Sequence, residues 1–151
     1  MKKIITSGID KIKGNNLLSI SIGLVYLLFG VLKFFTAVSP AEEIAAETID
    51  KLTFGFLSNT TSIFLLAIWE TCVGLFLLLN IHKKTILKLA LIHMVFTFTP
   101  LLIIPEMTFS NSSLAPTLLG QYIFKNIIII AALATLLKNE KHSSIKVFTN
   151  L

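Results

Sequence analysis

Four long apolar runs, separated by short polar segments, dominate the chain. They cover residues 17–38, 61–80, 86–104 and 117–137. Each is close to the roughly 20 residues that an α-helix needs to cross a bilayer. The polar segment between the second and third runs is only five residues long, 81–85, and therefore joins an antiparallel helix pair. The pattern predicts an all-α fold, an integral membrane four-helix bundle.

A shorter helix is predicted between the first two spans. Ser39 can cap it, Pro40 suits the first helical position, and Glu42 completes a capping box. Its apolar stripe consists of Ala41, Ile44, Ala45, Thr48 and Leu52. We expect this amphipathic helix to lie on the membrane surface, with its acidic side chains in water.

The distribution of lysine predicts the orientation. Polar tails precede and follow the bundle, at residues 1–16 and 138–151. Nine lysines lie in these tails and in the 81–85 turn: Lys2, Lys3, Lys11, Lys13, Lys83, Lys84, Lys138, Lys141 and Lys146. The two loops at the opposite end carry Lys51 alone, among several acidic residues. Because positive loops stay in the cytoplasm, both termini are predicted to be cytoplasmic.

Composition supports the membrane class. Of 151 residues, 54% are hydrophobic and 14% are charged, whereas a soluble domain is about one quarter charged. The net charge of +5 does not indicate nucleic-acid binding, because the lysines flank apolar spans and form no basic face. A single cysteine, Cys72, excludes an intrachain disulfide.

Four ionisable residues interrupt the apolar runs. Glu70 lies near the middle of the second run, where a carboxylate costs about 2.5–3.5 kcal/mol unless it is paired or hydrated. Lys33, His93 and Lys125 lie in the other three runs. Ionisable residues inside a membrane span mark functional sites by default, so this set is the candidate site.

Counting along the helices places these residues in depth. At 1.5 Å per residue, Glu70 and Lys125 both fall about 12–13 Å below the outer surface, which predicts an ion pair between them. Lys33 falls closer to that surface and can extend its ammonium group to it. His93 falls near the midplane and Glu106 at the outer mouth. The arrangement predicts a polar pocket open to the outer side.

Neighbours on the predicted helix faces complete the candidate set. The expected ligand-binding residues are Lys33, Glu70, His93, Glu106, Gln121, Tyr122 and Lys125. Four further residues have expected structural roles. Gly30, with Gly23 on the same face, allows close helix approach, and Gly74 shares a face with Glu70. Pro100 kinks the third span, and Asn126 shares a face next to that of Lys125 with Tyr122.

The chemistry of this set leaves alternatives open. A buried ion pair that only fixes helix register is one, and a helix–helix hydrogen bond at His93 is another. A metal site is disfavoured, since one His and one Glu with two lysines nearby make a poor ligand set. Two lysines, a His and a Glu instead suit a small anion, a quinone carbonyl or a proton relay. No motif assigns a reaction to the chain.

Five motifs occur in order: Gly30-Val-Leu-Lys-Phe-Phe35, Ser39-Pro-Ala-Glu42, Trp69-Glu-x-x-x-Gly74, Thr97-Phe-Thr-Pro-Leu101 with Pro105-Glu106, and Pro116-Thr-Leu-x-Gly-Gln-Tyr-x-x-Lys-Asn126. Over residues 17–137 this set resembles the DoxX-like family of bacterial four-helix membrane proteins. The resemblance is greatest to the branch that includes the inner-membrane protein of a reactive-chlorine resistance system. His93 is not part of the pattern.

The resemblance implies a four-helix bundle in the bacterial inner membrane. Members of the family are associated with thiosulfate:quinone oxidoreduction, with oxidative stress and with terminal-oxidase complexes. The expected function is therefore a membrane subunit of a redox or oxidative-stress system that binds a quinone or a small anion. The alternative functions are a non-catalytic accessory or structural subunit of a larger membrane complex, and a small-solute or proton-coupled transporter. The expected partners are the lipid bilayer and either a redox complex or further copies of the same chain.

Overall fold

The computed structural model describes residues 16–35, 39, 41–110 and 115–149, with backbone alone for 141–149. The predictions made for the tail 1–15 and for Pro40 lie outside these residues. The described part is helical and contains a single isolated bridge, between Phe109 and Pro116. The long helices of the described part are α2 (Leu17–Leu32), α4 (Asn59–Leu78), α5 (Lys83–Phe96) and α9 (Asn126–Thr149). The short ones are α3 (Glu42–Leu52), α6 (Pro100–Ile103), α7 (Pro105–Thr108) and α8 (Leu118–Phe124).

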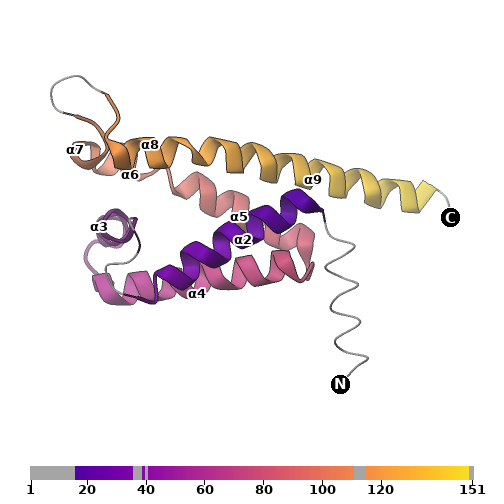
Figure 1. The fold of residues 1–151 in the computed structure, drawn as a ribbon, viewed down its shortest axis with the longest axis horizontal. Helices are drawn as coiled ribbons and strands as arrows, with labels where there is room; N and C mark the ends of the chain where they lie inside the picture. The colour runs from indigo at the N-terminus through magenta and orange to yellow at the C-terminus, as the bar shows by residue number, and fades with distance from the viewer. Residues whose placement is uncertain (1–15, 36–38, 40, 111–114, 150–151) are drawn as a thin grey trace.

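The long helices alternate in direction along the chain (Figure 1). Helix α2 crosses α4, α5 lies between this pair and α9, and α8 leads into α9. The short helices α3, α6 and α7 gather at one end of the molecule, and the turn between α4 and α5 lies at the other. We call these the α3 end and the turn end.

Within the described residues, three segments are long and apolar enough to cross a membrane: Asn59–Leu78, Lys83–Ile103 and Leu118–Glu140. They match the second, third and fourth predicted spans. The helix in the first predicted span, α2, is shorter than expected: it has 16 residues and ends at Leu32. Residues 33–35 form a turn, in which the amides of Phe34 and Phe35 bond to carbonyls three residues back. The prediction of one helix through these residues is therefore wrong.

Local sequence signals explain several helix boundaries. The side chains of Asn16, Ser58 and Thr117 accept hydrogen bonds from backbone amides at the starts of α2, α4 and α8. The third predicted span breaks where Pro100 was expected to bend it: α5 ends at Phe96 and α6 begins at Pro100.

Helix α3 occupies the predicted place but differs in detail. Its N-cap is Ala41, whose side chain makes no capping bond, so the predicted capping role of Ser39 is wrong. The Ser39 hydroxyl is buried and has no hydrogen-bond partner among the described residues, while its carbonyl accepts from the Glu42 amide. The buried residues of α3 are Ile44, Ala46 and Thr48, because the helix packs on α4 and α6. The predicted stripe member Leu52 is exposed.

Glycines bring α2 and α4 into close contact. A Cβ atom at Gly30 would lie 2.5 Å from the Thr71 backbone nitrogen, and one at Gly74 would lie 2.5 Å from the Leu27 nitrogen. No side chain fits at either position without moving a backbone. The predicted role of Gly30 in close packing thus agrees with the geometry, and Gly74 has the same role.

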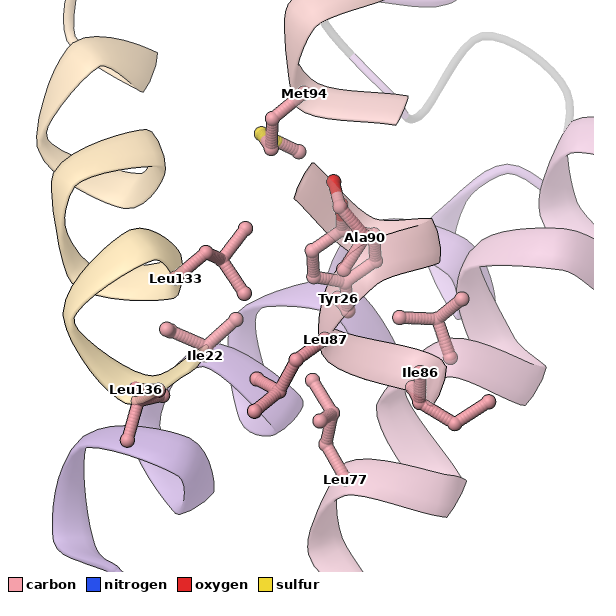
Figure 2. Packing of buried hydrophobic residues seen from close by; sticks show 10 residues of the cluster. Ile22, Tyr26, Leu77, Ile86, Leu87, Ala90, Met94, Leu133 and Leu136 are labelled. Atoms are coloured by element: carbon pink, nitrogen blue, oxygen red, sulfur yellow. The ribbon is translucent and has the colours of Figure 1, made fainter. Parts of the chain in front are cut away.

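Two hydrophobic clusters occur among the described residues. The larger joins α2, α4, α5 and α9 and includes Ile22, Tyr26, Leu77, Leu87 and Leu133 (Figure 2). The smaller lies at the α3 end and is centred on Ile44, Ile104 and Ile123. Gly120 lies directly against the carbonyl oxygen of Thr108, so α8 and α7 meet closely there.

Candidate functional site

Lys33 and Glu70 form a buried ion pair between α2 and α4. The Lys33 Nζ donates to Glu70 Oε2 at 2.6 Å, and the two side chains are only 4% and 10% exposed. Lys33 is the C-cap of α2, so the end of the helix carries its side chain inward. Two predictions are therefore corrected: the partner of Glu70 is Lys33 in place of Lys125, and Lys33 does not extend to the surface.

Lys125 has different neighbours. It lies between α8 and α9, where its Nζ sits 3.5 Å from the centre of the Tyr122 ring and 5.8 Å from that of Phe29. Such contacts stabilise a cation against an aromatic face. Tyr122 lies three residues before Lys125, a spacing at which side chains on a helix are neighbours. The contact between them is therefore local and does not involve α4.

A cavity of about 400 Å³ lies beside these charges, and its wall is mostly apolar. Its walls include Tyr26 and Met94 of the larger hydrophobic cluster and Ile44 and Ile123 of the smaller one, so it separates the two. The predicted residues at its wall are Lys33, Glu70, His93, Tyr122 and Lys125, together with Pro100 and Asn126. The structure thus brings five of the seven predicted ligand-binding residues to one cavity.

The other two predicted residues lie elsewhere. Gln121 is exposed and donates to the Pro116 carbonyl at 3.2 Å. Glu106 is exposed on α7, 3.6 Å from Lys51, which also contacts Glu47 at 3.1 Å. The hydrogen bond with Glu47 is the main cause that raises the pKa of Lys51, so this lysine stays charged and links α3 to α7. Neither Gln121 nor Glu106 forms part of the cavity wall.

His93 makes the helix–helix hydrogen bond that was one of its two expected roles. Its Nδ1 lies 3.1 Å from the Tyr26 hydroxyl of α2, and its ring packs edge-on against Trp69 of α4. Asn126 also joins two elements, donating to Thr97 Oγ1 at 3.1 Å. His93 and Asn126 nevertheless both reach the cavity wall.

Sequence reasoning missed Tyr26 and Phe29 as members of the site. Phe29 lies 5.8 Å from both lysine ammonium groups and packs edge-on against Tyr122. Tyr26 was recognisable, because it recurs with Gly30 and Lys33 at helical spacing and so shares their face. Phe29 gave no comparable signal among the many aromatic residues of the spans.

A second, more polar cavity of about 610 Å³ lies at the α3 end. It is lined by the ends of α2, α3 and α4, with Ser39, Glu42 and Glu43 in its wall. Lys33 lines both cavities. Lys33 of the ion pair therefore borders both the acidic recess at the α3 end and the apolar cavity within the helices.

Among the described residues, no three His, Cys, Asp or Glu side chains come together in a way that could hold a metal ion. No protein-family model, curated protein or solved structure matches the chain. The interpretation of the site therefore depends on its own geometry.

Proposed function

We propose that the chain is a DoxX-like integral protein of the bacterial inner membrane. In this proposal α2, α4, α5 with α6, and α8 with α9 form its four membrane-crossing elements. Support comes from the three segments long enough to span a bilayer and from the alternating directions of the helices (Figure 1). Both termini are placed in the cytoplasm, since the lysine-rich turn end then faces inward.

We further propose that the 400 Å³ cavity binds a quinone and that the protein serves as a membrane subunit of a redox or oxidative-stress system. Its volume lies within the range of small-molecule sites, about 300–1,000 Å³. An apolar wall with a few polar groups suits a planar ring that carries carbonyl oxygens better than it suits a small anion. This combination of apolar wall and convergent polar side chains is the observation that carries the proposal.

The position of the cavity also favours a lipophilic ligand. Val25 of α2 and Ile128 of α9 form part of its wall and are 37% and 74% exposed. The cavity therefore reaches the surface along the α2–α9 face. In a membrane that face meets lipid, so a ligand dissolved in the bilayer can enter from the side.

The fluorescence of Trp69 tests the proposal directly. It is the only tryptophan of the chain, and its ring lies 6.3 Å from that of His93 at the cavity wall. Titration of the protein in lipid nanodiscs with a decyl-tailed benzoquinone is expected to quench this fluorescence with saturation.

The variant Ala45→Leu, which fills the cavity from α3, should abolish the saturable quenching of Trp69 fluorescence. Ala131→Leu on the exposed face of α9 should leave it unchanged. Linear quenching of equal size in all three proteins would refute quinone binding in this cavity.

A structural accessory subunit is the second candidate, and the buried Lys33–Glu70 pair favours it. In that case the pair would hold α2 against α4 without serving a ligand. The transporter alternative gains no support, because Leu77, Leu87 and Leu133 are fully buried at the turn end, where a transport path would have to continue.

A further inference from the structure

The Tyr26 hydroxyl has two close partners on α5. Its oxygen lies 3.1 Å from the carbonyl oxygen of Ala90 and 3.1 Å from Nδ1 of His93. Figure 2 shows this hydroxyl at the edge of the larger cluster, on the side of Met94. Met94 and Tyr26 both line the cavity, so this small network forms part of its wall.

Counting hydrogens assigns the proton on the imidazole. A phenol has one hydrogen to donate, and a carbonyl oxygen can only accept. Both contacts are hydrogen bonds only if Tyr26 donates to Ala90 and accepts from His93. Nδ1 of His93 therefore carries the hydrogen. If Tyr26 instead donated to His93, its hydroxyl oxygen and the Ala90 carbonyl oxygen would lie 3.1 Å apart with no hydrogen between them.

The other ring nitrogen of His93 is then an acceptor. In the neutral imidazole only one nitrogen carries hydrogen, so Nε2 has a free lone pair. No hydrogen bond from the described residues reaches it. A charged imidazolium would need a carboxylate nearby, and Glu70, at the same cavity, is bonded to Lys33.

We propose that the cavity preferentially binds the hydroxyl-bearing, reduced form of its ligand, a hydroquinone. One hydroxyl donates to Nε2 of His93, and the second oxygen accepts from the ammonium group of Lys125, which the Tyr122 ring holds at the cavity wall. Tyr26 is the positioning residue that fixes the acceptor. This inference rests on the proposed function and adds to it which redox state is bound more tightly.

Isothermal titration calorimetry in nanodiscs under argon tests the preference. The ligands are a decyl-tailed benzoquinone, its hydroquinone, and the dimethyl ether of the hydroquinone, which has no hydrogen to donate. We expect the hydroquinone to bind roughly tenfold more tightly than either of the others, the effect of one net hydrogen bond. Equal affinity for all three would overturn the inference while leaving quinone binding intact. Absence of binding by all three would refute the proposed function itself.

Two variants locate the source of the preference. His93→Phe and Tyr26→Phe should each reduce the ratio of the quinone and hydroquinone dissociation constants to about twofold or less. A full preference in His93→Phe would overturn the inference.

Nitrogen NMR of ¹⁵N-histidine-labelled protein gives a readout independent of ligand, with His82 and His142 replaced by Gln. His93 is then the remaining histidine, and we expect its Nδ1-protonated form. Tyr26→Phe should shift the population of His93 towards the Nε2-protonated form. An Nε2-protonated His93 with Tyr26 intact would also overturn the inference.

Discussion

At the scale of single residues, the Lys33–Glu70 pair is the most demanding feature of the molecule. The attraction between two buried charges offsets the free energy of their desolvation only when the geometry is good. Here the two charged atoms lie 2.6 Å apart and the side chains are nearly inaccessible. Removing one partner leaves the other buried and uncompensated. Removing both leaves an apolar contact between α2 and α4.

This asymmetry predicts the stability of a mutant set. Glu70→Leu and Lys33→Met should each lower the free energy of unfolding by about 3–5 kcal/mol, and the double variant should recover most of that loss. Unfolding in mixed micelles with increasing sodium dodecyl sulfate measures these values.

The matched control is Lys125→Met, alone and with Glu70→Leu. Lys125→Met alone should change the free energy of unfolding little, and in combination it should restore none of the stability lost in Glu70→Leu. The reason is that Lys125 contacts aromatic rings instead of Glu70. Rescue by Lys125→Met would show that the pairing described above is wrong.

The residues show how far sequence reasoning reached. The buried charges were recognisable because carboxylates and ammonium groups in apolar runs are costly. Their pairing was not, since the depth count assumed a straight helix through residues 17–38, whereas α2 ends at Leu32 and turns Lys33 inward. The distinction between the two lysines depends on this one helix end.

At the scale of elements, the crossing of α2 and α4 positions the ion pair. The Gly30 position contacts the backbone of Thr71, and the Gly74 position contacts that of Leu27. The sequence indicated which glycines share a face with the charged residues. It did not indicate that α8 packs on α7 through Gly120, because that contact depends on the path of the loop between them.

Adding one methyl group at the crossing should therefore be costly. Gly30→Ala and Gly74→Ala are each expected to lower the free energy of unfolding by about 1–3 kcal/mol, the usual cost of overpacking. Both should also weaken the contact between Lys33 and Glu70.

Cys72→Ala, an exposed position on α4 only two residues from Gly74, is the control and should be neutral. Sodium dodecyl sulfate titration provides the comparison. Equal stability of all three variants would contradict the close helix contact.

At the scale of the whole molecule, the helix directions place the 81–85 turn at one end and α3 at the other (Figure 1). The four apolar runs predicted that these two segments lie at opposite ends, and the helices of the structure have that arrangement. The cavity was not predictable as a shape, because it is the space left between two hydrophobic clusters formed by residues distant in sequence.

The proposed orientation predicts which lysine positions can be reached from outside the cell. In a Cys72→Ala background, Lys51→Cys should react with a membrane-impermeant maleimide in spheroplasts. Lys84→Cys should react only after the membrane is opened. The reverse pattern would invert the topology, and labelling of both positions in intact spheroplasts would contradict a single orientation.

The central proposal is that the cavity lined by α2, α3, α4, α5, α8 and α9 holds a quinone-class ligand. The most direct measurement is the quinone content of protein purified gently from its native membrane, determined by chromatography and mass spectrometry of an organic extract. The wild type and Ala131→Leu should retain close to one quinone per chain, and Ala45→Leu should retain far less at equal thermal stability. Equal quinone content in all three, at the ratio found in the co-purified lipid, would contradict the claim.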